Sequence, residues 1–243
     1  MRIAVLSDVH SNLEALEAVL EHTGGRADTF YVLGDIVGYG ADPQAVVDRL
    51  DALGGTLIAG NHDLAATDRF DTQWFNRVAA TAIRWTVEAL DDGGRAVLQA
   101  LEPRRESLAG LLVHGSVVDP AAEYVVNTGD AAVSFEADPF EICFFGHTHL
   151  PVVFWTDGGT HVNRRGLVDA RALQLEPGTR YMLNPGSVGQ PRDGDPRASY
   201  MLFDTEGRAA TVHRVEYAIQ TAQRKIRDAG LPEVLADRLA VGR

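Results

Sequence analysis

The feature of this sequence that most restricts its fold is a series of short apolar runs that each end in glycine or polar residues. Each run is three or four residues long and bounded on both sides, as is typical of strands that are covered on both faces. We therefore predict six strands, each followed by a polar tail. The runs and tails are "IAVL" at 3–6 with "SDVH", "FYVL" at 30–33 with "GDIVG", "TLIA" at 56–59 with "GNHD", "LLV" at 111–113 with "HGS", "ICFF" at 142–145 with "GHTH", and "YML" at 181–183 with "NPGS".

Two helix patterns separate the first three runs. Ser11 with Glu14 forms a capping box ahead of leucines at helical spacing. Asp42 with Pro43 is typical of a helix start, which favours a structural role for Asp42. This order of strand, helix, strand, helix and strand predicts a parallel sheet, in which the tails meet at the carboxyl edge where open α/β sheets bind ligands.

The segment 64–107 contains no strand run and predicts a helical insertion close to that edge. Its aromatic side chains could stack on a base or an aromatic leaving group, and they are Phe70, Trp74, Phe75 and Trp85. Five residues of this segment instead recur every three or four positions, which favours packing along one face of an ordinary helix. They are Trp74, Val78, Ala82, Trp85 and Ala89. Strands joined by a turn at "DTEGR" follow "SYMLFD", and helices are predicted over about 216–240, so we expect a single domain over 1–243.

The charge balance restricts the partners. The 22 basic and 34 acidic residues leave a net charge of −12, which argues against a surface that binds long nucleic acid by neutralising its phosphates. A small phosphate ester is compatible with this charge, because bound metal can reverse the local sign. The sequence leaves the oligomeric state open.

Two further features indicate a cytoplasmic protein without a membrane segment. Asp8 comes too early for the apolar region of a signal peptide, and no apolar stretch has the length of a membrane span. The single cysteine, Cys143, excludes an intramolecular disulfide, and its apolar neighbours predict that it is buried.

The polar tails contain a set of side chains that can bind metal ions. Each has an ordinary structural explanation when taken alone, but five of the eight histidines fall in these tails, and this joint occurrence favours a metal site. Imidazole combined with a few carboxylates suits Mn, Fe, Co, Ni or Zn better than Mg or Ca. The candidate ligands are Asp8, His10, Asp35, Asn61, His114, His147 and His149.

Seven ligands are too many for one catalytic ion with an open position, and they fit two divalent ions. Two such ions bring four positive charges, of which Asp8 and Asp35 neutralise two. The remaining positive charge would attract a phosphate and hold a hydroxide between the ions.

The motifs "DVH", "GD", "GNHD", "HG" and "GHTH", in this order, resemble the signature set of the calcineurin-like metallophosphoesterases, and more narrowly their compact bacterial branch. The glycine-rich "NPGSVGQPR" at 184–192 is also similar to that branch. The resemblance implies a four-layer αββα sandwich of two mixed sheets, with the metal site at its edge.

The resemblance also implies a role for each candidate ligand. Asp8, His10 and His149 would bind one metal ion, while Asn61, His114 and His147 would bind the second, with Asp35 bridging the two. His62 would be the catalytic general acid and not a ligand, and Asp63 would orient its imidazole or tune its pKa. The implied cofactors are two divalent transition-metal ions, with manganese expected to support activity best.

One position departs from the family pattern. Many members continue the second motif as GD-x-x-D, whereas this chain has Gly38 at the place of the last acid. That acid is usually not a metal ligand, so the departure leaves the predicted metal site unchanged. It argues only against assuming that this chain shares the substrate preference of the phosphoprotein phosphatases.

The function expected from these features is hydrolysis of small or nucleotide-type phosphate esters. A serine/threonine protein phosphatase or a dinucleoside-polyphosphate hydrolase would use the same site, and a non-catalytic scaffold would have lost some of the ligands that this chain retains. Asn184, Ser187 and Arg192 could contact the phosphate, although a turn-rich linker explains their segment equally well.

Overall fold

Two six-stranded mixed sheets form the centre of the molecule. The computed structural model describes residues 1–159 and 161–243. The first sheet consists, in spatial order, of β3 (Thr56–Leu57), β2 (Thr29–Val32), β1 (Arg2–Leu6), β11 (Ala198–Asp204), β12 (Ala209–Val215) and β9 (Ala172–Gln174). The second consists of β4 (Arg104–Ser107), β5 (Gly110–Val113), β6 (Ile142–Phe144), β10 (Arg180–Pro185), β7 (Pro151–Thr156) and β8 (Asn163–Gly166).

The first three strands have the predicted parallel arrangement. β1 pairs with β2, and β2 pairs with β3, both in parallel. The connections between them are α1 (Leu13–Thr23) and α2 (Pro43–Asp51). In the second sheet β5, β6 and β10 are also parallel to one another. The carboxyl ends of both parallel groups carry the polar tails.

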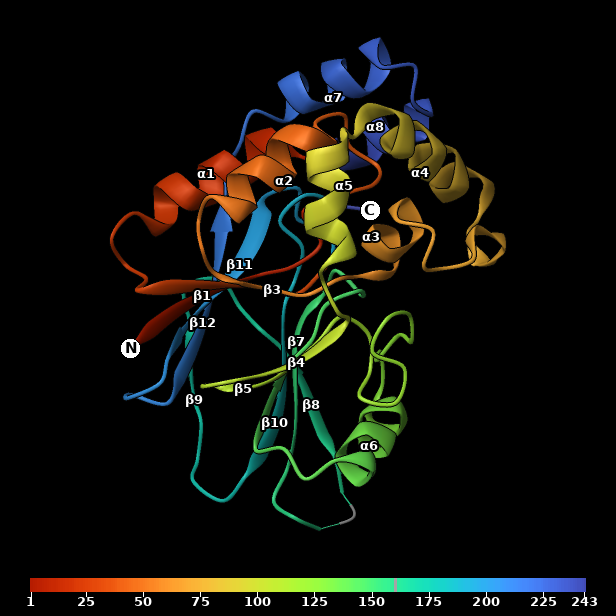
Figure 1. Ribbon diagram of the computed structural model, residues 1–243. Coiled ribbons are helices and arrows are strands. Elements are labelled where there is room, and N and C mark those ends of the chain that lie inside the picture. Colours follow the sequence, from red (N-terminus) through yellow and green to blue (C-terminus); the bar gives the residue numbers. More distant parts are fainter. Residues whose placement is uncertain (160) are drawn as a thin grey trace.

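Three hydrophobic cores hold the sheets and helices together, and the alternating residues of β1 contribute to two of them. Ala4 and Leu6 pack under α1 and α2, whereas the alternate residues Ile3 and Val5 face the second sheet. On the far side of the second sheet, Phe154 packs with Phe135 of α6 (Thr128–Ala137). The layers are therefore helices, sheet, sheet and helix (Figure 1), which confirms the predicted four-layer αββα sandwich.

Helices occupy most of the predicted insertion. They are α3 (Asn61–Ala66), the short 3₁₀ helix η1 (Thr72–Trp74), α4 (Arg77–Ala89) and α5 (Asp92–Gln99). The end of the predicted insertion was wrong, because 104–107 form β4, which pairs with β5 in an antiparallel hairpin. The run "RRES" lacks the apolar pattern of a strand because β4 is an edge strand with two exposed residues.

The prediction that Trp74 packs as part of one helix was also wrong. Trp74 ends η1, three residues before α4 begins, and it is 82% exposed. Val78 and Trp85 of α4 do pack inward, against α7 (Ile219–Asp228) and α8 (Glu233–Asp237), and η2 (Arg238–Ala240) closes the same cluster. Figure 1 shows α4, α7 and α8 together on one side of the molecule.

The helix caps differ in detail from the sequence patterns. Asn12, and not Ser11, caps α1 by accepting a hydrogen bond from the amide of Ala15 at 3.1 Å. Ser11 has a φ of 53° because it belongs to the loop that directs His10 inward. Asp42 occupies the N-cap position of α2 as predicted, but its side chain accepts a hydrogen bond from Lys225 at 2.9 Å and not from the helix.

The C-terminal helical region begins later than predicted, since α7 starts at Ile219. Across the part of the chain that the structure describes, none of the helices combines the length and the apolar character needed to cross a bilayer.

Candidate metal centre

All seven candidate ligands lie at the carboxyl ends of neighbouring strands or directly after them, and all seven are buried. Most of them have a backbone conformation that non-glycine residues rarely adopt, with φ between 49° and 63°. Such strain persists only where the surrounding structure enforces it, and it concentrates at functional sites. The ligands with positive φ are Asp8, His10, Asp35, His147 and His149.

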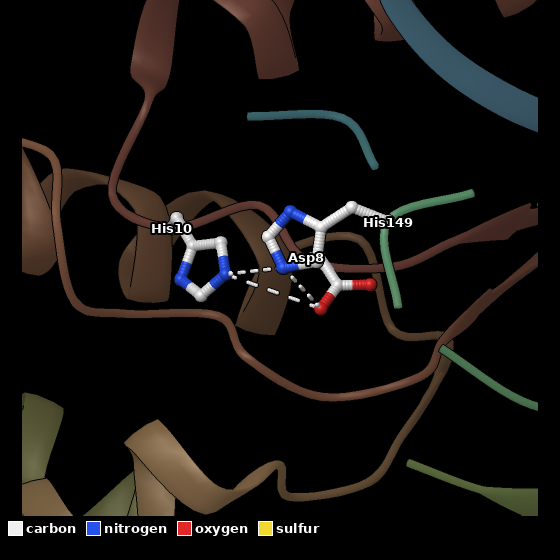
Figure 2. Close-up of side chains that lie close together, drawn as sticks. All are labelled: Asp8, His10 and His149. Atoms are coloured by element: carbon white, nitrogen blue, oxygen red, sulfur yellow. Dashed lines mark hydrogen bonds and ion pairs between the residues drawn. The ribbon is translucent and has the colours of Figure 1, made fainter. Parts of the chain in front are cut away.

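The first group of side chains joins the end of β1 to the loop after β6. Nε2 of His149 lies 3.2 Å from Nε2 of His10 and 3.2 Å from Oδ1 of Asp8, and the latter atom is 3.9 Å from Nε2 of His10. Figure 2 shows the three side chains converging on one point. They form one of the groups whose ligand atoms could hold a single ion, as the resemblance implied.

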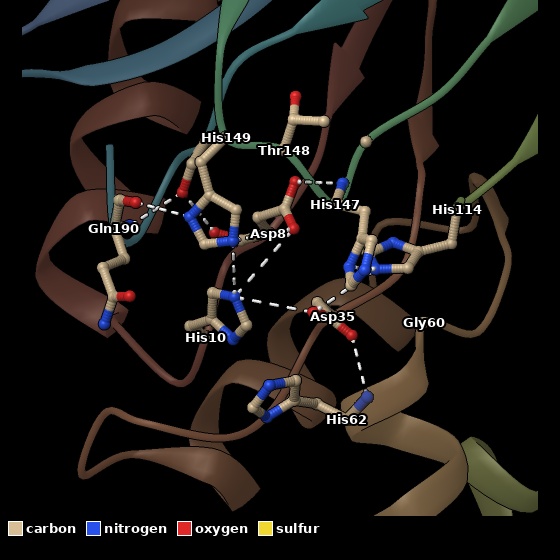
Figure 3. Close-up of polar contacts among 12 residues, drawn as sticks. Asp8, His10, Asp35, Gly60, His62, His114, His147, Thr148, His149 and Gln190 are labelled. Atoms are coloured by element: carbon tan, nitrogen blue, oxygen red, sulfur yellow. Dashed lines mark hydrogen bonds and ion pairs between the residues drawn. The ribbon is translucent and has the colours of Figure 1, made fainter. Parts of the chain in front are cut away.

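The second group contains Asp35, His114 and His147. Nε2 of His114 lies 3.1 Å from Nδ1 of His147 and 3.3 Å from Oδ2 of Asp35. The same Asp35 oxygen is also 3.6 Å from Nε2 of His10 in the first group. Asp35 therefore lies between the two groups (Figure 3), at the place of a bridging ligand.

Hydrogen bonds on the outer nitrogens fix the protonation of three of these imidazoles. The Nδ1 atoms of His10, His114 and His149 contact the carbonyl oxygens of Val37, Leu33 and Gln190 at 3.2, 2.7 and 2.5 Å. Because a carbonyl oxygen only accepts, each Nδ1 donates. The neutral rings of His10 and His149 therefore turn the lone pair of Nε2 inward, and His114 does the same once its Nε2 has lost its proton.

Inward lone pairs at such separations repel one another unless a cation lies among them. Nitrogen ligands bind zinc at about 2.0–2.1 Å, so two ligands of one ion lie roughly 3.0–3.4 Å apart. Four of the five separations given above within the two groups, at 3.1–3.3 Å, match this requirement, and the fifth, between Oδ1 of Asp8 and Nε2 of His10, is longer at 3.9 Å. The residues present therefore fit metal ions.

Unpartnered oxygen atoms point to the same conclusion. Oδ1 of Asp8 and Oδ1 of Asn61 are buried and have no hydrogen-bond partner. A buried oxygen without a partner is costly, and coordination to an ion would satisfy it. Asn61, the first residue of α3, lines the same cavity as His147, with which the resemblance groups it as a ligand of the second ion.

The electrostatics keep most of the imidazoles ready for metal binding. Burial lowers the pKa of His10 and His149, and burial together with His114 lowers the pKa of His147 to about 3, so these rings are neutral. Burial alone would also lower the pKa of His114, but the carboxylate of Asp35 raises it to about 9. A cation at this position would therefore compete with a proton for Nε2 of His114.

His62 differs from the ligands described above because no carbonyl oxygen anchors its ring, although its imidazole lies close enough to His10 and Asp35 to form a further group that could hold an ion. Its ring lies between Tyr39, at a centroid distance of 4.5 Å, and Phe75, at 4.8 Å with nearly parallel planes. Its backbone amide donates to Oδ1 of Asp35 at 2.9 Å, which links the residue to the bridging carboxylate. Burial lowers the pKa of His62 to about 4.

Asp63 makes no hydrogen bond to the imidazole of His62. Its two carboxylate oxygens accept from the backbone amides of Val37 and Gly60 at 3.0 and 2.9 Å. Asp63 thus ties the loop after β2 to the start of α3, and burial with the nearby Asp35 raises its pKa to about 7. The aromatic neighbours position the imidazole. Phe75 is one of the aromatic residues of the predicted insertion, whereas the sequence patterns did not single out Tyr39.

Gly38 explains the departure from the GD-x-x-D pattern. A Cβ atom at this position would lie 2.3 Å from Nδ1 of His62, and the backbone has a φ of 91°. An acid at position 38 is therefore incompatible with this placement of His62. Gly146 has a similar role in the H-x-H loop, because a Cβ there would lie 2.0 Å from the hydroxyl of Ser7.

A cavity of about 460 Å³ opens above the ligands. Arg192 lines it and forms no ion pair with any carboxylate in the described chain. Asn184 and Ser187 do not line it. Asn184 is buried and donates to the carbonyl oxygen of Gly146, while Ser187 donates to that of Asp8. Of the three residues considered for phosphate contact, only Arg192 faces the cavity.

The model of the calcineurin-like phosphoesterase superfamily domain matches residues 1–208. The chain belongs to this superfamily. The known structure of a metallophosphoesterase from Sphaerobacter thermophilus superposes with a TM-score of 0.91 at 44% identity, covering 100% of this chain and 99% of that one. The fold and the resemblance derived from the motifs are thereby confirmed.

Two curated relatives of this phosphoesterase are similar over most of their length. The uncharacterised protein MJ0912 of Methanocaldococcus jannaschii is 37% identical over 255 residues, which cover 99% of this chain and 98% of the relative. The phosphodiesterase YfcE of Escherichia coli K12 is 27% identical over 217 residues, with coverages of 85% and 89%. Family membership makes the chain a hydrolase of phosphoric ester bonds, with His and Asp groups that could bind the metal.

Proposed function

We propose that this phosphoesterase hydrolyses small phosphodiesters with two divalent transition-metal ions, and that manganese supports the reaction best. The observation that carries the proposal is the position of Asp35, whose Oδ2 lies within 3.6 Å of imidazole nitrogens from both ligand groups. The preference for diesters is supported by the similarity to YfcE, which is named a phosphodiesterase.

The two ions would be held as the motifs suggested, by Asp8, His10 and His149 on one side and by Asn61, His114 and His147 on the other, with Asp35 shared. When bound, the ions supply Lewis acidity that neutralises phosphoryl oxygens and generates a hydroxide nucleophile near neutral pH.

The chain's own residues position the ester. Arg192 contributes a guanidinium without a competing carboxylate to the cavity, where it would bind a phosphoryl oxygen. His62 lines the same cavity and would donate a proton to the leaving oxygen. Burial lowers the pKa of His62 to about 4, so protonation of the ring depends on negative charge beside it, which Asp35 supplies and the bound ester would add to.

The test combines metal content with turnover. The purified protein is analysed for bound metal, and hydrolysis of bis(p-nitrophenyl) phosphate and p-nitrophenyl phosphate is measured with Mn²⁺, Ni²⁺, Zn²⁺ and Mg²⁺. The proposal predicts two ions per chain and faster turnover of the diester. A monoester preference would favour the phosphatase alternative, and full occupancy without activity on either ester would favour a scaffold.

A further inference from the structure

We propose that Trp74 and Tyr124, here called the aromatic rim, determine substrate specificity by stacking on a nucleobase-sized aromatic group of the phosphate ester. The inference rests on the proposed phosphodiesterase function and adds the substrate class, namely diesters that carry a nucleoside on one side of the phosphate.

The aromatic rim and the metal ligands face the same cavity. Its lining combines His147, His149 and Asp35 with Trp74 and Tyr124, so a single ligand can reach both. The volume of about 460 Å³ falls within the roughly 300–1,000 Å³ of pockets that bind small organic molecules. A phosphate at the metal ligands leaves most of that space to its ester groups.

Trp74 is exposed to an extent that packing does not explain. The neighbouring Phe75 stacks on His62 and contacts Phe70 at a centroid distance of 5.8 Å, so both phenylalanines serve the position of the imidazole. Trp74 is 82% exposed at the cavity although tryptophan is highly buried on average. Its position is defined, since Asp71 caps η1 by accepting from the amide of Gln73 at 2.8 Å.

Tyr124 comes from a different segment, between β5 and α6, and is fixed by stacking. One face of its ring lies on His147, with a centroid distance of 3.9 Å and an angle of 25° between planes. The residue nevertheless remains 49% exposed. A planar group can therefore stack on it without displacing another side chain.

The chemistry of the cavity selects a ligand with one anionic and one aromatic end. Arg192, together with the ions that the ligands would hold, attracts a phosphate, whereas Trp74 and Tyr124 provide aromatic surfaces that any base can stack on. The net charge of −12 disfavours a long polyanion on the surrounding surface. A mononucleotide ester combines the two required ends in a small molecule.

The kinetic test compares two substrates that differ only in the base. These are the methyl diesters of adenosine 5'-phosphate and of ribose 5-phosphate. In both, water adds to phosphorus, the bond from phosphorus to the methoxy oxygen breaks, and methanol leaves with the proton. We expect kcat/KM to be about tenfold higher for the adenosine ester. Trp74→Ala and Tyr124→Leu should abolish this preference, while Trp74→Phe and Tyr124→Phe retain it.

A matched control and a binding experiment separate this proposal from the proposed function. Trp155→Phe changes an indole outside this cavity and should leave the preference intact. In a Trp85→Phe, Trp155→Phe double variant, Trp74 is the remaining tryptophan, and adenosine 5'-phosphate should quench its fluorescence whereas ribose 5-phosphate should not.

The outcomes are distinguishable. Hydrolysis of both esters at equal rates, or an equal loss on both in Trp74→Ala, would overturn the aromatic rim and leave the phosphodiesterase intact. If the metal-loaded protein hydrolyses neither ester nor bis(p-nitrophenyl) phosphate, the proposed function fails. Base-specific quenching of Trp74 would then still support the nucleotide site, and its absence would overturn it.

Discussion

The floor and the rim of one cavity are built in opposite ways. The metal ligands are buried, five of the seven have strained backbones, and three imidazoles are anchored by carbonyl oxygens. Trp74 and Tyr124 at the rim are exposed and come from segments outside the sheets. The difference indicates that the candidate ligands are held by rigid strand ends, whereas the residues proposed to select the ester group are exposed side chains that contribute little to the fold.

The largest effect is expected at the floor of the cavity, from removing the carboxylate of Asp35 that both ligand groups share. Asp35→Asn should lower kcat by about 10³-fold or more, since it removes a charge from both ligand groups and weakens both ions. Metal analysis and turnover of bis(p-nitrophenyl) phosphate measure the effect. The exposed Asp51→Asn is the matched control, and activity within a fewfold of wild type in Asp35→Asn would exclude a bridging role.

The next largest loss of activity is expected from replacing His62, the proposed general acid. His62→Gln should lower kcat for esters with poor leaving groups by about 10²–10⁴-fold, because the leaving oxygen loses its proton donor. Esters with good leaving groups should be affected much less, and metal content should stay unchanged if His62 acts as the general acid and not as a ligand. Loss of metal in this variant would show that His62 is a ligand.

The burial of His62 also predicts a pH dependence of stability in the metal-free protein. Its pKa is lowered from 6.5 to about 4, so the unfolded chain binds more protons between these values. The free energy of unfolding therefore falls as pH decreases from 6.5 to 4, with about 3 kcal/mol attributable to this ring. Urea denaturation at several pH values should show a smaller decrease for His62→Gln, and identical slopes would contradict the burial effect.

The smallest effect is expected at the rim. Trp74→Ala should change the free energy of unfolding by no more than about 0.5 kcal/mol, because the side chain is 82% exposed. Metal content should also be unchanged. A loss of several kcal/mol in thermal or urea denaturation would mean that Trp74 is part of the packed structure and would remove the contrast between floor and rim.

The sequence was informative where short polar tails follow buried strands. The tails after β1, β2, β3, β5 and β6 predicted all seven residues that the structure brings together, because parallel strands align their carboxyl ends. The rim was not predictable in this way. For Trp74 the sequence offered both stacking on a base and helix packing, and the helical spacing favoured the wrong one. Tyr124 follows no regular pattern, so only the tertiary arrangement reveals that it faces the site.

Some side-chain contacts could not be predicted from the sequence for a related reason. The pairing of Glu14 and Asp42 with Lys225, and the contact of Asp63 with the amides of Val37 and Gly60, depend on distant segments. Sequence patterns describe neighbours along the chain. At Asp42 a tertiary contact with Lys225 replaces the predicted cap, whereas α1 is capped by Asn12, the neighbour of Ser11.

The most direct test of the two-ion site is the metal content of His147→Ala and His149→Ala. His149 belongs with Asp8 and His10, whereas His147 belongs with Asp35 and His114. Starting from two ions per chain, each single variant should retain one ion and the double variant none, as measured by elemental analysis after gel filtration. Loss of both ions in each single variant, or of neither, would contradict the assignment of the two histidines to different ions.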